Sequence, residues 1–131
     1  MAMKRLVSDF IGLKVFVYFN LHKKCFSVRA LEGEHKGSVI SHADVVYLRD
    51  AEPKVSQAGR ERVIREKQKN VHAGIVGILT LPQDFEGDSK RSLTYNPYVY
   101  KTFVYVDSKE DFKKSDWCKM NSIGRVSVLV D

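Results

Sequence analysis

The densest group of side chains that could recognise an anion lies in the run GRERVIREKQKNVHA, from Gly59 to Ala73. Guanidinium groups suit phosphate because their planar fork makes paired, charge-assisted hydrogen bonds. A helix through this run would place cations that are three and four residues apart on one face. An amide and an imidazole follow where the helix is expected to end, and they could orient a sugar or a base. The candidate ligand-binding residues of this run are Arg62, Arg65, Lys69, Asn70 and His72.

The same run also fits an ordinary solvated helix face. Glu61 and Arg65 are four residues apart, and Glu66 lies beside them. Local pairs of this kind stabilise a helix by roughly 0.2–0.5 kcal/mol each. The sequence leaves both interpretations open.

A second group of polar side chains follows an aromatic strand near the start of the chain. Asn20 and His22 precede two lysines, and aromatic rings beside basic groups are what a site needs to stack bases and pair phosphates. We therefore include Asn20 and His22 among the candidate ligand-binding residues. Ordinary turn chemistry is the competing explanation for them. For Tyr98 and Tyr100, which would share one face of an expected strand, sheet packing is the competing explanation.

No pattern in the sequence favours catalysis. The chain has no glycine-rich phosphate loop with a following lysine and hydroxyl, no HExxH and no nucleophile elbow. Its histidines do not form the pair that a two-histidine phosphoesterase needs. Cys25 and Cys118 are 93 positions apart, which is neither a metal-ligand spacing nor a disulfide framework, so we expect reduced thiols. We expect no enzyme, no cofactor and no metal site.

Composition favours a single cytosolic domain with an anionic partner. The length of 131 residues suits one domain spanning residues 1–131. The net charge is +6. Six basic and two acidic residues fall in the segment 54–69, and such a local excess of cations attracts anionic partners. Asp9 interrupts any apolar leader, and no window reaches the roughly 18 apolar residues of a membrane span. We therefore expect no membrane partner.

The periodicity predicts mostly strands around one helix. Leu13–Leu21 alternates apolar and polar residues, which is typical of a half-buried strand. A polar turn then leads into a second strand, so a hairpin is expected, and Ser56 is placed as an N-cap. The further expected elements are strands over 37–41 and 44–51 in a four-strand meander, a helix from Ser56 to Lys69, a strand over Val71–Leu81, a loop over Gln83–Asn96, a strand over Tyr98–Val106, a turn or short helix over Ser108–Met120 and a strand from Ile123.

These elements predict a β-rich α+β fold. The arrangement would be an antiparallel sheet, or a partly open barrel, of about seven strands with one prominent basic helix. A domain of this size with many apolar strand residues leaves sheet edges exposed, and a second copy would cover them most simply. We therefore expect a homo-oligomer.

Several runs of the chain resemble small phage and prophage proteins. They are YFNLHKKCFSVRALEG from Tyr18, SHADVVYLRDA from Ser41 and GRERVIREKQKNVHAGIVG from Gly59. The layout of a β-rich meander with one basic helix resembles the anti-defence nucleotide-sponge proteins of the Thoeris anti-defence 1 type. The resemblance implies a phage protein in the host bacterial cytoplasm. It would bind and sequester a cyclic nucleotide immune signal, such as a cyclic ADP-ribose isomer or a cyclic oligonucleotide, without cleaving it.

Two other functions remain open. A basic nucleic-acid-binding phage protein fits the sequence pI of about 9.3 and the basic helix. A protein–protein inhibitor or a structural module of the virion is the third candidate. Salt dependence distinguishes a cyclic nucleotide ligand from a nucleic acid. A protein that displaces several counterions from a nucleic acid loses affinity steeply as salt rises, whereas a cyclic nucleotide carries few charges.

Overall fold

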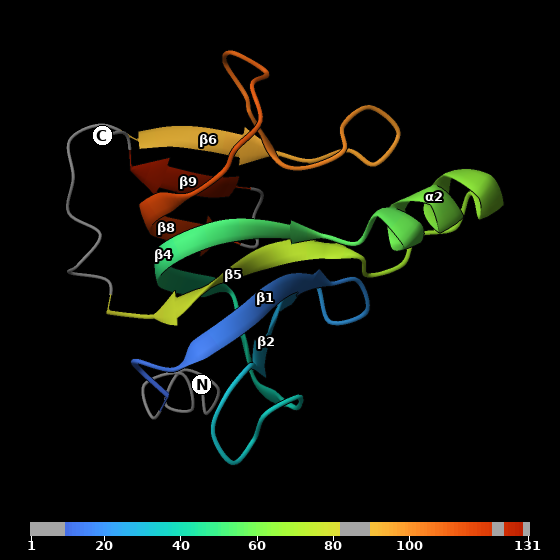
Figure 1. Ribbon diagram of the computed structural model, residues 1–131. Coiled ribbons are helices and arrows are strands. Elements are labelled where there is room, and N and C mark those ends of the chain that lie inside the picture. Colours follow the sequence, from blue (N-terminus) through green and yellow to red (C-terminus); the bar gives the residue numbers. More distant parts are fainter. Residues whose placement is uncertain (1–9, 82–89, 122–124, 130–131) are drawn as a thin grey trace.

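The computed structural model describes residues 10–81, 90–121 and 125–129. Nine strands and one helix occur in this part of the chain (Figure 1). In sequence order they are β1 (Lys14–Asn20), β2 (Cys25–Ala30), β3 (Val39–Ala43), β4 (Val45–Val55), α2 (Gln57–Glu66), β5 (Ala73–Leu79), β6 (Lys90–Thr94), β7 (Val104–Tyr105), β8 (Ser115–Asn121) and β9 (Arg125–Leu129).

The strands form one open antiparallel sheet in the order β3-β2-β1-β5-β4-β8-β9-β6-β7. The expected β-rich antiparallel fold is confirmed, and the described residues contain one helix, but they form nine strands and not about seven. The hairpin from β1 to β2 and the next step to β3 are also as expected. The four-strand meander is wrong in its last member, because β4 leaves β3 and pairs with β5 and β8. Val46 and Leu48 of β4 are buried, which suits a strand paired on both sides.

The core lies inside the bend of the sheet. Only Val63 of α2 is buried, so α2 provides little apolar surface to cover the strands. β4 carries a bulge between Arg49 and Glu52, where Asp50 has φ 50°. Bulges bend and twist a strand. One continuous cluster results, joining buried residues of β1 and β2, such as Val17, to residues of β6 and β8, such as Leu93 and Met120.

Two expectations for the second half of the chain are wrong. Of the strand expected over Tyr98–Val106, only Val104–Tyr105 is a strand, β7. Residues 97–99 instead form a turn, in which the Asn96 side chain accepts a hydrogen bond from the Tyr98 backbone amide at 2.9 Å. Ser115–Asn121 is the strand β8 and not a helix, because Cys118 and Met120 alternate inward with partly exposed neighbours. Of the expected loop over 83–96, residues 83–89 lie outside the described residues, and Lys90–Thr94 form β6.

The helix begins where the sequence predicts and ends early. The Ser56 side chain accepts a hydrogen bond from the Gly59 backbone amide at 3.1 Å, which confirms the N-cap. Lys67 has φ 57° and closes the helix by donating its amide to Val63. Another turn would place Lys67 and Asn70 on the buried side of Val63, where they would bury no apolar surface. Figure 1 shows α2 projecting beyond the ends of β4 and β5. No described helix is long and apolar enough to cross a membrane.

Candidate ligand-binding groove

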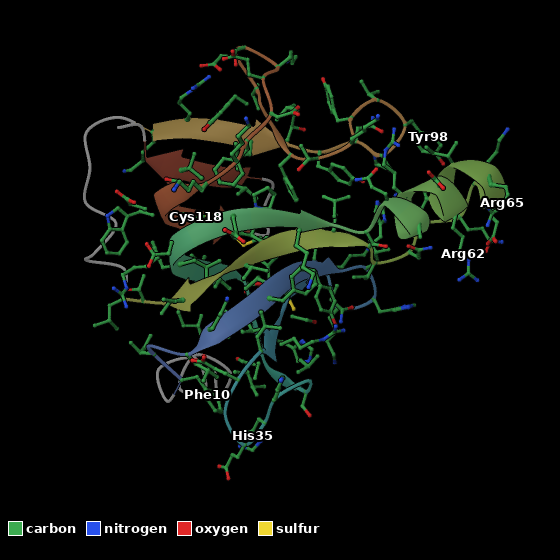
Figure 2. All side chains as sticks on the ribbon, in the orientation of Figure 1. Phe10, His35, Arg62, Arg65, Tyr98 and Cys118 are labelled. Atoms are coloured by element: carbon green, nitrogen blue, oxygen red, sulfur yellow. The ribbon has the colours of Figure 1, made fainter. Side chains whose placement is uncertain are left out.

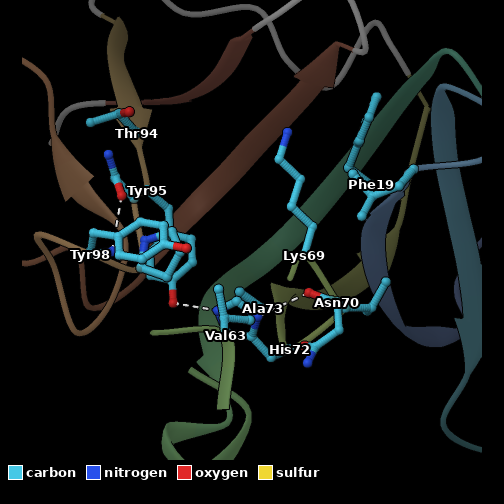
Figure 3. Close-up of a pocket in the computed structure, with 13 residues that line it drawn as sticks. Phe19, Val63, Lys69, Asn70, His72, Ala73, Thr94, Tyr95 and Tyr98 are labelled. Atoms are coloured by element: carbon cyan, nitrogen blue, oxygen red, sulfur yellow. Dashed lines mark hydrogen bonds between the residues drawn. The ribbon is translucent and has the colours of Figure 1, made fainter. Parts of the chain in front are cut away.

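A groove with a volume of about 600 Å³ opens where the end of β1, the start of β5 and the chain after β6 meet (Figure 3). Sites for small molecules commonly have volumes of about 300–1,000 Å³, so a nucleotide-sized ligand fits. Most of the lining is apolar or aromatic, with a few polar groups. The lining residues are Phe19, Leu21, Val63, Lys69, Asn70, Val71, His72, Ala73, Thr94, Tyr95, Asn96, Pro97 and Tyr98.

His72 is held by hydrogen bonds at both ring nitrogens. Its Nδ1 lies 3.0 Å from the carbonyl oxygen of Asn70, and its Nε2 lies 2.7 Å from the Tyr95 hydroxyl (Figure 3). A carbonyl can only accept, so Nδ1 carries the proton. In the neutral ring Nε2 then accepts from the Tyr95 hydroxyl. The Tyr95 oxygen therefore presents a lone pair to the groove.

Tyr95 is fixed in place by its aromatic neighbours. Its ring centroid lies 5.2 Å from that of Phe103 and 5.5 Å from that of His72. Burial raises the pKa of Tyr95, and the nearby Arg60 charge opposes this shift. Since the ordinary tyrosine pKa is already about 10, the hydroxyl stays protonated at neutral pH. It can hold its hydrogen bond to His72.

The helix α2 borders the groove through Val63 and packs closely on its neighbours. A Cβ atom at Gly59 would lie 2.6 Å from the Cβ atom of His72, so only glycine permits this approach. Arg60 donates from Nε to the carbonyl of Tyr100, and Gln57 donates from Nε2 to the carbonyl of Lys101, each at 2.8 Å. The helix thereby joins the segment before β5 to the segment after β6.

Lys69 provides a cation at the groove. Figure 3 shows its side chain between the tyrosine side of the groove and Phe19. Lys69 and Asn70 also border a neighbouring helix-end hollow of about 380 Å³, which Arg62 lines as well. Both residues are exposed, and no ion pair or hydrogen bond engages the Lys69 ammonium among the described residues. It is therefore available to an anion.

The structure does not place Arg62, Arg65 and Lys69 on one helix face. α2 ends at Glu66, so the expectation of a shared face is wrong. Arg62 and Arg65 instead lie 3.3 and 3.7 Å from Glu66, at the outer end of α2 (Figure 2). Surface pairs of this kind contribute little to stability, but they offset the local positive charge. A role of the two arginines in binding stays a prediction.

Asn20 and His22 also lie outside the lining of the groove. The Asn20 side chain accepts hydrogen bonds from the amides of His22 and Lys23 at 3.0 Å, and it donates to the Ser27 hydroxyl at 3.0 Å. These contacts hold the β1–β2 turn, as an asparagine at a turn commonly does. His22 is exposed. From this hairpin it is Phe19 and Leu21 that line the groove.

A side hollow of about 390 Å³ continues the groove toward the core. It shares Phe19, Ala73, Thr94 and Tyr95 with the groove. Its floor includes Phe26, whose ring centroid lies 5.8 Å from that of Phe19 in an edge-on arrangement. The joined surface offers several aromatic rings to a planar ligand.

Sequence reasoning did not bring the aromatic half of the site together. Tyr95 was expected to belong to a polar loop and Tyr98 to a strand, and no pattern placed either beside His72. The run Tyr95-Asn96-Pro97-Tyr98 carried the available signal, because Asn-Pro favours the start of a turn. A turn at this place presents both tyrosines to one side.

Comparisons with known proteins identify relatives among phage proteins. Residues 10–127 match the family described as Mycobacterium phage L5 gene 82 protein. The relative named "Gene 82 protein" of Mycobacterium phage L5 is 44% identical over 120 residues, which cover 86% of this chain and 93% of the relative. No solved structure matches the chain. The expected likeness to small phage proteins is confirmed.

Proposed function

The chain belongs to the Mycobacterium phage L5 gene 82 protein family, and we propose that it binds a phosphate-bearing nucleotide in the groove beside His72. The observation that carries the proposal is the convergence of Lys69, a cation with no ion pair among the described residues, with aromatic rings and the His72–Tyr95 pair around one groove of nucleotide size. Phosphate needs the cation, and a base needs an exposed ring.

Two rings at the mouth of the groove suit a base. Tyr98 is 56% exposed and Phe19 is 36% exposed, so each can gain contacts when a planar ligand covers it. Stacking of a base on an aromatic side chain is worth roughly 1–3 kcal/mol. The Tyr95 oxygen and the Asn70 side chain can receive or give hydrogen bonds to a ribose or to the edge of a base.

The ligand is held without being cleaved. A general base needs a free lone pair within reach of the proton it removes, but both nitrogens of His72 are already engaged inside the protein. Cys118 is fully buried, so it is not a nucleophile for a ligand in the groove. These features support binding and sequestration in preference to turnover.

Sequestration gives the protein its role in infection. By lowering the free concentration of a cyclic nucleotide immune signal, a phage protein blocks a bacterial defence, as a sponge of the Thoeris anti-defence 1 type does. The proposal includes a homo-oligomer, since the groove opens to solvent along Phe19 and Tyr98 and a second copy would close it. The protein acts in the host bacterial cytoplasm, where such signals are made.

Titration of the protein with ADP-ribose and with a cyclic dinucleotide, followed by calorimetry, tests the proposal. A charged hydrogen bond contributes roughly 1.5–3 kcal/mol, so Lys69→Ala should weaken binding about ten-fold to a hundred-fold. Tyr98→Leu should weaken it by a similar factor through lost stacking. Lys113→Ala is the matched control, because Lys113 is exposed and lines neither the groove nor the two hollows beside it.

Two results would contradict the proposal. The first is that neither nucleotide binds to the wild-type protein at millimolar concentration, and the second is that Lys69→Ala binds nucleotide as tightly as the Lys113→Ala control. The first result removes the ligand class, and the second moves the site away from the groove.

A further inference from the structure

The face of the sheet opposite the core carries its own group of aromatic and basic side chains. Val15 and Val17 of β1 are fully buried, and successive residues of a strand point to opposite faces, so Phe16 and Tyr18 point outward. Directly paired residues on antiparallel strands share a face. The pairing of β2, β1, β5, β4 and β8 therefore defines one outer face, which carries Phe16, Tyr18, Arg29, Tyr47, Arg49, Trp117 and Lys119.

One aromatic group lies on β1. The ring centroids of Phe16 and Tyr18 are 5.7 Å apart, and the planes are tilted by 32°. The guanidinium carbon of Arg29 lies 6.0 Å from the Phe16 ring and 5.6 Å from the Tyr18 ring. Gly74 makes room for this group, because a Cβ atom there would lie 2.7 Å from the Phe16 ring. All three side chains remain partly exposed.

A second aromatic group lies on β4 and β8. The Lys119 ammonium is 5.7 Å from the Tyr47 ring centroid, and these two residues are directly paired. Trp117 is paired with Arg49, one step along the same two strands. Tyr47, Trp117 and Lys119 are partly exposed, and Arg49 is exposed. Each group thus combines rings with a cation.

The two groups are spaced for a ligand that crosses the strands. β1 and β8 are separated by β5 and β4, and neighbouring strands lie about 4.8 Å apart, so Phe16 and Trp117 are about 14 Å apart across the strands. They are also offset along the strands, because Phe16 pairs with Val76 of β5 whereas Arg49, the partner of Trp117, pairs with Ile78. Arg49 is on β4, so it lies on the side of the second group that is nearer β1. Lys14 and Lys54 are exposed on the same face, where Glu52 is an acidic neighbour paired with Val76. The face is therefore basic, and it complements an anionic chain.

We propose that this outer face binds a single-stranded nucleic acid that runs across the strands. Bases stack on Phe16 and Tyr18 at one end and on Tyr47 and Trp117 at the other, while phosphates meet Arg29, Arg49 and Lys119. Single strands expose the faces of their bases to aromatic side chains, whereas a duplex hides them. A sheet face that carries both aromatic rings and cations provides both contacts.

This surface is distinct from the groove. Phe19 and Ala73 line the groove on the core side of the sheet, and the outer face lies on the other side of the same strands. Tyr18 also borders the side hollow. Trp117 and Arg49 line neither the groove nor either hollow. Variants of Trp117 and Arg49 should therefore affect nucleic-acid binding without affecting nucleotide binding in the groove.

The chain contains a single tryptophan, so intrinsic fluorescence reports on this surface directly. Titration of the full chain with a 12-nucleotide oligothymidylate should quench Trp117, because the base stacks on its ring. Anisotropy of a labelled copy of the same oligonucleotide gives the affinity. Trp117→Leu should weaken binding about ten-fold, and Arg49→Gln should weaken it by a similar factor.

Charge variants on and off the face test the location. Glu52→Gln removes an acid from the face and should strengthen binding, whereas Lys36→Gln removes an exposed cation from the β2–β3 turn and should leave binding unchanged. Each phosphate contact adds about 0.7 to the salt dependence of a single strand, so Arg49→Gln should reduce the slope by about that amount. Because the Arg49 side chain is exposed, Arg49→Gln should keep the fold intact even if Trp117→Leu lowers stability.

The proposal is overturned if the oligonucleotide leaves Trp117 fluorescence unchanged, or if Lys36→Gln weakens binding as much as Arg49→Gln. It is also overturned if a duplex of the same length or polyglutamate binds equally well, since the face would then be a general polyanion or acidic-protein surface. Lys69→Ala should leave oligonucleotide binding unchanged. The proposal of nucleotide binding in the groove and the proposal of nucleic-acid binding on the outer face are thus tested by different variants.

Discussion

Gly59→Ala tests how α2 and His72 define the groove. In an isolated helix this change is stabilising by about 1 kcal/mol, because alanine has the higher helix propensity. Here the new Cβ atom would lie 2.6 Å from the Cβ atom of His72. A Cβ atom cannot move away without its backbone, so α2 and the segment before β5 must separate.

The expected sign of the change is therefore reversed. Overpacking costs typically 1–3 kcal/mol, and loss of the 2.7 Å His72–Tyr95 hydrogen bond costs about 1 kcal/mol more. After the propensity gain is subtracted, we expect a net loss of about 1–3 kcal/mol. For a domain of this size each kcal/mol lowers Tm by roughly 3–5 °C. Nucleotide binding should fall as His72 leaves the groove wall.

Thermal unfolding and calorimetric titration of Gly59→Ala measure both effects. Ala58→Gly is the matched control, because Ala58 is an exposed helix residue beside it. That change should cost about 1 kcal/mol through propensity alone and leave nucleotide binding unchanged. A Gly59→Ala protein that is more stable than wild type and binds nucleotide normally would refute the close approach of α2 to His72.

Three further predictions follow from the fold. Burial raises the pKa of the Cys118 thiol to about 12, so Cys118 in the folded protein should not react with an aromatic disulfide reagent at pH 8. Reaction of Cys118 in the native protein as fast as in the unfolded protein would contradict its burial. Burial, and to a lesser degree the Lys23 charge, lowers the pKa of His42 below its usual value of 6.5. The unfolded state therefore binds the proton more readily, so Tm should be constant above about pH 6.5 and fall as the pH drops below it. His42→Asn should flatten this fall in Tm, and an unchanged pH dependence in that variant would exclude His42 as its source. Light scattering should give at least twice the chain mass of 15.0 kDa, and a mass near 15 kDa at micromolar concentration would argue against the homo-oligomer.

The fold was predictable where a short motif decides the local structure. Strict alternation marked β1, and Ser56 marked the start of α2, because each depends on neighbours in sequence. The strand order was not predictable. β4 does not lie beside β3, because it pairs with β5 and β8 on its two edges and carries a bulge at Asp50. No local sequence pattern predicts either feature.

The candidate site was predictable only in part. Lys69, Asn70 and His72 were expected and line the groove, since they follow the helix at the point where the chain turns into β5. The length of α2 was misjudged because helix propensity ignores what a further turn would bury. Tyr95 and Tyr98 come from a segment more than twenty residues away. Their meeting with His72 is a tertiary contact, and sequence periodicity carries no information about it.

The most direct measurement of the central claim is the identity of a ligand that the groove retains. The purified protein is incubated with a lysate rich in nucleotide signals, washed and heated, and the released small molecules are identified by mass spectrometry. We expect an intact phosphate-bearing nucleotide from the wild-type protein and from the Lys113→Ala control, and a strong loss of it from Lys69→Ala. Release of no nucleotide from the wild-type protein, or equal release from Lys69→Ala, would contradict the claim that the groove binds and holds a nucleotide.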